Sequence, residues 1–228
     1  MSINLAEFQS QLKSYKCKYP CSETDPYDFD EFWRWKLRIE SGNGQVLDES
    51  NRDEAHKKLS KALLKWRAYR PSKSAECLKT LRTSLAHISD AYDRIRNYTL
   101  LEFDKVPIEP LKLIWNELGR TKEKNGKIND QDYYIVSISK PLIFLWGQTL
   151  AFDSIVRSNI PKFGIYSYII NDTRWNFETW KEVMEKFEGN LRKQPEAIDA
   201  FEKEAEKRFG KSPIVPYGRF LDIYYYKE

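Results

Sequence analysis

A chain of 228 residues is long enough to bury a substantial core, as one large domain or two small ones. It contains 41% hydrophobic and 32% charged residues, and no run of about 18 apolar residues predicts a membrane span. The start of the chain lacks the basic and apolar regions of a signal peptide. Only 9 glycines and 10 prolines occur, which favours long helices over a β-sandwich with its frequent turns.

Three cysteines are too few for a disulfide framework, and Cys17 and Cys21 lack the second ligand pair of a zinc site. The two histidines also stand outside any metal-site spacing. We therefore expect no metal, no cofactor and a reducing, cytoplasmic location.

The net charge is +4, but it is unevenly distributed. Residues 1–55 carry a net charge of −4, residues 56–82 carry +8, and the remainder balances. A basic segment of this kind indicates a polyanionic partner and does not identify a fold.

Apolar spacing and helix-end signals predict helices in chain order. The expected ranges in the first half are 4–15, 27–39, 48–69, 72–98 and 106–119. A polar loop at 120–132 precedes two expected helices, one with Pro141 in its first turn that stops at Gly147, and one opened by Asp153. Further helices are expected at 175–187, 195–209 and, with a strand as the alternative, 217–227.

These elements predict an all-α fold, or nearly so, as a compact bundle of eight or nine helices. We expect a single helical domain over 1–228, and leave open a division into two lobes, about 1–105 and 106–228.

The helix expected at 48–69 separates its basic and apolar faces. Lysines spaced about 6 Å apart along one face could each meet a backbone phosphate of a duplex. The candidate nucleic-acid-binding residues are Lys57, Lys58, Lys61, Lys65, Arg67 and Arg70. The structural alternative is a face that only contacts solvent.

The segment 139–160 is the most apolar in the chain, with Lys140 near its start and Asp153 in its second half. Asp153 occupies an expected N-cap position, and Lys140 precedes the proline at the mouth of the expected helix. In a purely structural interpretation, Asp153 caps its helix and pairs with Arg157, while Lys140 extends from the core edge.

The run Leu150-Ala151-Phe152-Asp153-Ser154-Ile155-Val156-Arg157 resembles the Val-Asp-Thr-His-Val segment of helix-hairpin-helix DNA glycosylases of the endonuclease III and oxoguanine glycosylase kind. The later run 217–222 adds a similarity to small prokaryotic proteins grouped near that superfamily. The resemblance implies a glycosylase-like helical fold, a role in DNA repair, and Asp153 as the aspartate that assists cleavage of the glycosidic bond. It implies Lys140 as the lysine that attacks the sugar in bifunctional members.

The chain departs from this superfamily in three respects. The interval between Lys140 and Asp153 is shorter than in these enzymes. Residues 136–139 replace the glycine-rich hairpin that holds a DNA phosphate, and the iron–sulfur cysteines near the C-terminus are absent. An extruded base would need an aromatic pocket. The candidate pocket residues are Trp146, Phe152, Phe163 and Tyr166, which could equally belong to the core.

Three functions remain open. The first is a DNA-binding protein of glycosylase-like fold that acts on damaged or modified bases, with or without lyase activity. The second is a nucleic-acid-binding helical protein without catalysis, and the third is a helical interaction module for an acidic protein partner. The sequence contains no nucleophile elbow, P-loop or zinc-protease motif.

Overall fold

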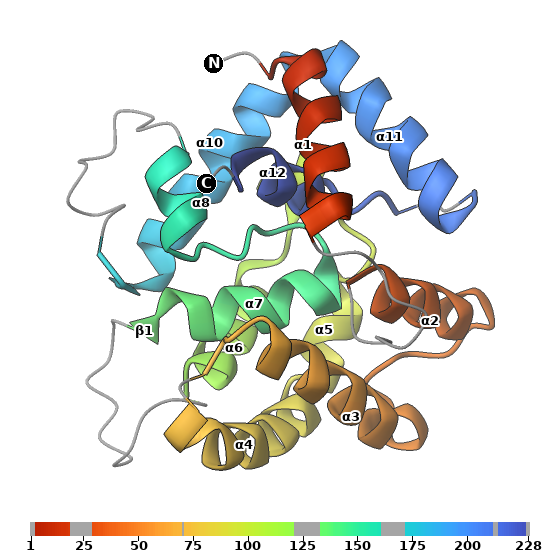
Figure 1. Ribbon diagram of the computed structural model, residues 1–228. Helices are drawn as coiled ribbons and strands as arrows, with labels where there is room; N and C mark the ends of the chain where they lie inside the picture. Colours follow the sequence, from red (N-terminus) through yellow and green to blue (C-terminus); the bar gives the residue numbers. More distant parts are fainter. Residues whose placement is uncertain are drawn as a thin grey trace.

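The computed structural model describes residues 3–18, 29–69, 71–120, 133–160, 172–211 and 214–226 (Figure 1). The first half of the chain contains α1 (Leu5–Lys18), α2 (Phe29–Ser41), α3 (Glu49–Lys65), η1 (Pro71–Lys73), α4 (Ser74–His87), α5 (Ser89–Ile95), η2 (Leu100–Lys105) and α6 (Ile108–Gly119). The second half contains β1 (Tyr133–Tyr134), α7 (Ile135–Trp146), α8 (Ser154–Asn159), β2 (Arg174–Trp175), α10 (Phe177–Leu191), α11 (Pro195–Phe209) and α12 (Tyr217–Tyr225).

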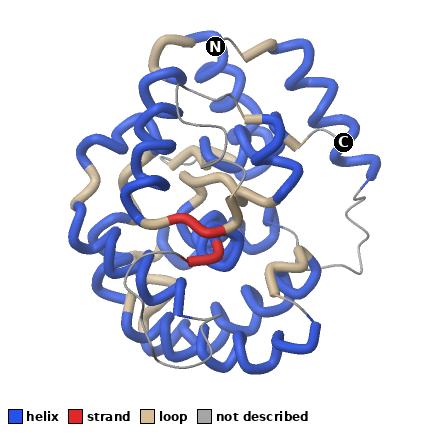
Figure 2. Tube along the Cα trace, turned by 90° about the vertical axis from the view of Figure 1, so that its left-hand side faces the viewer, coloured by secondary structure: helices blue, strands red, loops and turns tan. Residues whose placement is uncertain are grey.

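The prediction of a nearly all-α fold is confirmed. Strands β1 and β2 form a short antiparallel pair, with Tyr133 opposite Trp175 and Tyr134 opposite Arg174, and helices dominate the described residues (Figure 2). Even within these residues the helices outnumber the eight or nine expected. One reason is that the expected helix 72–98 is divided at Ile88, which ends α4 and precedes α5.

One buried core cluster contains residues from Ile3 to Tyr225 and so includes residues of both 1–105 and 106–228, the division left open above. Helices from opposite ends of the sequence pack together, α1 against α12 and α2 against α11. In Figure 1, α7 runs through the middle of the molecule, with α3, α4 and α6 below it and α1, α8 and α10–α12 above. Across the described ranges, no helix is both long and apolar enough to cross a membrane.

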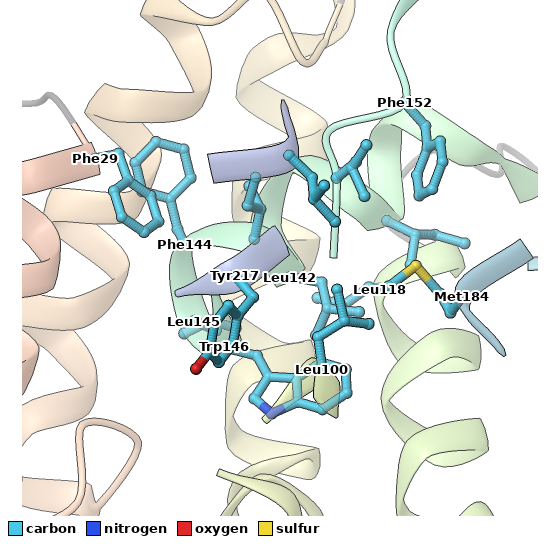
Figure 3. Close-up of a cluster of buried hydrophobic side chains, with 14 of the residues drawn as sticks. Phe29, Leu100, Leu118, Leu142, Phe144, Leu145, Trp146, Phe152, Met184 and Tyr217 are labelled. Carbon is cyan, nitrogen blue, oxygen red and sulfur yellow. The ribbon is translucent and has the colours of Figure 1, made fainter. Parts of the chain in front are cut away.

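Helix α7 forms the centre of this core. Every residue of α7 except Val136 is buried. Figure 3 shows Phe144, Leu145 and Trp146 in a cluster with Phe29, Leu100 and Met184. A helix enclosed on all sides needs apolar residues all round, which explains the near absence of a polar face in this segment.

The expected position of Lys140 at a helix mouth is wrong. Helix α7 begins at Ile135, so Lys140 and Pro141 lie inside it. The β-branched residues before Lys140 are weak helix formers, but their burial in the core outweighs this local preference. The expected stop is confirmed, because Gly147 ends the helix with a φ of 75°.

Candidate functional site

The segment 147–153 is a non-helical crossing that connects α7 to α8 through the interior. Its buried backbone groups are bound by side chains from three helices. Asp222 Oδ1 accepts from the Ala151 amide at 2.8 Å, and Ser139 Oγ donates to the Ala151 carbonyl. Arg157 Nη1 donates to the Phe152 carbonyl at 3.3 Å. The crossing is therefore fixed immediately before Asp153.

Two glycines allow α12 to lie against this crossing. A Cβ on Gly218 would come within 2.4 Å of the backbone of Thr149, and one on Gly147 would come within 2.8 Å of Pro216, the N-cap of α12. The Arg219 amide donates to the Gly147 carbonyl at 3.2 Å. This close approach brings Asp222 to the Ala151 amide.

Phe152 adopts a left-handed conformation, with φ of 47°, one residue before Asp153. Such a conformation costs a non-glycine residue about 1–2 kcal/mol and persists where surrounding contacts enforce it. The Phe152 ring is fully buried and packs 5.0 Å from the Trp175 ring. Strained backbone conformations that the surrounding contacts hold in place are common at functional sites. Asp153 directly follows such a residue.

Asp153 has two partners. Its Oδ1 accepts from the Val156 amide at 3.1 Å, which confirms the predicted N-cap of α8. Its Oδ2 lies 3.7 Å from Lys140 Nζ, and the side chain is 22% exposed. The carboxylate thus fixes its own helix, pairs with a lysine and keeps access to solvent. The expected partner Arg157 is also buried; burial lowers its pKa, and the charges of Asp153 and Asp172 oppose this shift.

Lys140 crosses from α7 to the end of the basic helix. Its Nζ donates to the Trp66 carbonyl at 2.5 Å, and its side chain is only 8% exposed. Trp66 is the C-cap of α3, where backbone carbonyls lack helical partners and a cation is favourable. Burial lowers the pKa of Lys140, and the charges of Asp153 and Asp222 oppose this shift.

A second ion pair lies behind the first. Arg219 Nη1 is 2.7 Å from Asp222 Oδ2, and both side chains are buried. The Arg219 guanidinium lies 4.8 Å from the Trp66 ring centroid. Burial raises the pKa of Asp222 to about 6, while the charge of Arg219 lowers it and that of Asp153 raises it. Four charged groups of three elements therefore interact around the crossing and the end of α3.

The sequence interpretation did not assign Arg219 and Asp222 to the site. A usable signal was present, because they are the charged residues of an otherwise apolar helix and stand at i and i+3. That spacing places opposite charges on one helix face. In a buried helix such a pair must be satisfied internally.

The proposed phosphate-binding residues do not share one environment. Lys57, Lys61, Lys65 and Arg67 are exposed. Lys58 instead pairs with Glu54 at 3.3 Å and lies 5.8 Å from the Trp35 ring, so it faces a different direction. Arg70 lies outside the described residues.

The structure does not place the described pocket candidates at an opening. Trp146 and Phe152 are fully buried; the Trp146 indole donates to the Tyr98 carbonyl at 3.0 Å. Both belong to the core because α7 and the crossing are enclosed. Phe163 and Tyr166 lie outside the described residues.

One cavity, of about 550 Å³, lies elsewhere and includes neither Lys140 nor Asp153. Its lining residues come from α11, the start of α12 and neighbouring loops: Thr99, Glu202, Ala205, Glu206, Gly210, Lys211, Val215 and Tyr217. Among the residues that the structure describes, no group of three or more His, Cys, Asp or Glu side chains is arranged to hold a metal ion.

No protein-family model matches the chain, and comparisons with curated proteins and with solved structures give no match either. The candidate site is therefore interpreted from its own geometry. Its two parts are the exposed basic residues of α3 and the carboxylate of Asp153, and Lys140 connects them.

Proposed function

We propose that this protein binds DNA through the basic face of α3 and hydrolyses the N-glycosidic bond of a damaged or modified base at Asp153. One observation carries the proposal. Lys140 Nζ contacts the Trp66 carbonyl and lies 3.7 Å from Asp153 Oδ2, so the basic helix ends beside a solvent-accessible carboxylate. Binding and chemistry would thus use adjacent parts of one surface.

Binding would rest on electrostatics. Lys57, Lys61 and Lys65 recur every four residues, about 6 Å apart along the helix, and all three are exposed. Each lysine that neutralises a phosphate releases counterions, so affinity should fall steeply as salt rises. The exposed Arg67 extends this surface past the end of α3.

The chemistry assigned to Asp153 is stabilisation of positive charge. As the bond between the sugar C1′ and the base nitrogen breaks, the electron pair leaves with the base and the sugar becomes an oxocarbenium-like cation. The ionised carboxylate stabilises that cation. Water then forms the new bond to C1′ and loses its proton, and the departed base takes up a proton.

The proposed role of Lys140 is to hold the Asp153 carboxylate in position through the 3.7 Å ion pair. Its environment argues against a nucleophilic role. Attack on the sugar would require Nζ to leave the Trp66 carbonyl and Asp153 and to reach the sugar C1′, but the Lys140 side chain is almost fully buried. We therefore propose base release by hydrolysis, without the Schiff base of a lyase.

The test compares wild type with Asp153→Asn on duplex DNA carrying a panel of damaged and modified bases. Asparagine caps a helix as well as aspartate does, so the variant should fold and bind. We expect base release by wild type and its loss in the variant, with no borohydride-trapped adduct on abasic DNA. Release that is unchanged in Asp153→Asn would contradict the assigned role.

A second candidate function is DNA binding without catalysis. It is favoured by the structural roles of both charges, because Asp153 caps the start of α8 and Lys140 binds the carbonyl at the end of α3. Salt-dependent binding together with no base release from any lesion would support this second function.

A further inference from the structure

Leu64 is a large apolar side chain exposed within the basic surface of α3. Three large hydrophobic residues are exposed in the described part of the chain: Leu64 at 49%, Leu113 at 43% and Ile108 at 41%. Single exposed leucines are common and need no explanation by themselves. Leu64 differs in its position, because Lys61 and Lys57, three and seven residues before it, lie on the same side of the helix.

Arg67 provides a second, independent observation at the same helix end. It adopts a left-handed conformation with φ of 51°. Its amide donates to the Leu64 carbonyl at 3.1 Å, and the Ala68 amide donates to the Leu63 carbonyl at 2.9 Å. This is the Schellman motif, whose left-handed position is usually glycine because a Cβ is disfavoured there.

An exposed arginine therefore occupies a position at which glycine would stabilise the fold. Backbone strain of this kind is concentrated at functional sites, which motivates a role for the Arg67 side chain. Arg67 is exposed and ends the row of Lys57, Lys61 and Lys65. A guanidinium there can bind a phosphate or stack on an unpaired base.

We propose that Leu64 and Arg67 form an insertion tip that enters the base stack of DNA bound on α3. Apolar side chains that enter between bases pay a cost of unstacking, which is smallest where pairing is already disturbed. The substrate class that follows is duplex DNA with a local mismatch or unpaired base. This inference rests on the DNA binding proposed above, and deepens it by naming the form of DNA that is preferred.

The geometry favours nucleic acid over a protein partner. An apolar residue bordered by repeating cations at phosphate-compatible spacing matches a charged backbone next to apolar bases. An acidic protein partner remains an outcome of the test, because it would make binding of either duplex weak and independent of Leu64.

The experiment measures binding of two otherwise identical duplexes, one fully paired and one with a single mismatch beside 2-aminopurine, whose fluorescence rises when it unstacks. Leu64→Ala is compared with Leu113→Ala, a matched change at an exposed leucine of α6. We expect wild type and Leu113→Ala to prefer the mismatched duplex and to raise its fluorescence at saturation. Leu64→Ala should produce no such rise in fluorescence, and its preference for the mismatched duplex should be about tenfold smaller.

A second variant guards against effects on folding. Arg67→Gly should melt at a higher temperature than wild type. It should still lose part of the preference for the mismatched duplex, and unfolding could not then explain that loss. Equal behaviour of Leu64→Ala and Leu113→Ala, with both duplexes bound, would overturn the insertion tip and leave the proposed DNA binding intact. Failure of the wild type to bind either duplex would overturn DNA binding itself, and the tip with it.

Discussion

Lys140 Nζ donates to the carbonyl of Trp66 at 2.5 Å, a contact between residues 74 positions apart in the sequence. It joins α7, a largely buried helix, to the C-terminal end of the basic helix α3. The same ammonium lies 3.7 Å from Asp153 Oδ2 at the start of α8. One buried lysine thereby determines how the exposed basic surface is positioned relative to the accessible carboxylate.

Lys140→Met should destabilise the fold by about 1–2 kcal/mol. Methionine can occupy the buried position, but the Trp66 carbonyl loses its charged donor. Asp153 is partly exposed and remains in contact with solvent, which limits the cost of losing its partner. Urea unfolding, with Lys57→Met at an exposed position of α3 as the control, measures the difference. Equal unfolding free energies of the two variants would contradict the structural role of Lys140.

Two substitutions of Asp153 distinguish its role as a helix cap from the catalytic role proposed for its charge. Asp153→Asn should leave the unfolding free energy nearly unchanged, because an amide oxygen can still accept from the Val156 amide. Asp153→Ala should lower that free energy by about 1 kcal/mol. Thermal and urea unfolding of the two variants, beside the base-release assay, would show whether loss of activity follows the charge or the cap. Destabilisation by asparagine equal to that by alanine would contradict this assignment.

Much of this region could be predicted from local sequence. The stop at Gly147, the cap at Asp153 and the helical C-terminal segment each depend on signals within a few residues, and the structure confirms them. The contact of Lys140 with Trp66 could not be predicted in this way, because it depends on how α3 and α7 pack. The start of α7 at Ile135 was missed for the same reason, since its burial outweighs the weak propensity of Val136 and Ile138.

Asp222 should make stability depend on pH. Burial raises its pKa to about 6 in the folded protein, above its ordinary value, so the folded state binds a proton more tightly than the unfolded state. The associated stabilisation is present below about pH 4 and is lost as pH rises through 6. The total change is on the order of 3 kcal/mol.

Asp222→Asn tests this dependence, because the amide oxygen can still accept from the Ala151 amide but does not titrate. The unfolding free energy of wild type minus that of the variant should fall between pH 4 and pH 7. Urea unfolding at intervals of half a pH unit gives this difference. A difference that rises with pH or stays constant would contradict a raised pKa at Asp222.

Arg67→Gly should raise the unfolding free energy by about 1 kcal/mol, because glycine removes the cost of the left-handed conformation. The greater freedom of glycine in the unfolded chain offsets part of this gain. A matched Lys65→Gly change inside α3 should instead destabilise by about 1 kcal/mol. Chemical denaturation of both variants measures the two effects, and destabilisation by Arg67→Gly would remove the evidence for strain.

The same residue explains an error in the predicted end of α3. The helix was expected to continue to residue 69, yet it ends at Lys65, with Trp66 as its C-cap. The usual signal for this ending is a glycine, and Arg67 occupies that position instead. Where an unfavourable residue occupies the left-handed position, sequence rules based on stability misplace the end of the helix.

The central claim is that α3 is a DNA-binding surface, and the salt dependence of binding tests it most directly. Fluorescence anisotropy of a labelled duplex would be measured from low to physiological salt for wild type and for the triple variant Lys57→Glu, Lys61→Glu, Lys65→Glu. A triple reversal on α11 and α10, Lys181→Glu, Lys203→Glu and Lys207→Glu, is the control for net charge. The account predicts steep salt dependence for wild type and control, and a slope smaller by about 3 for the α3 variant. Equal affinities and equal slopes for the α3 variant and the control would contradict it.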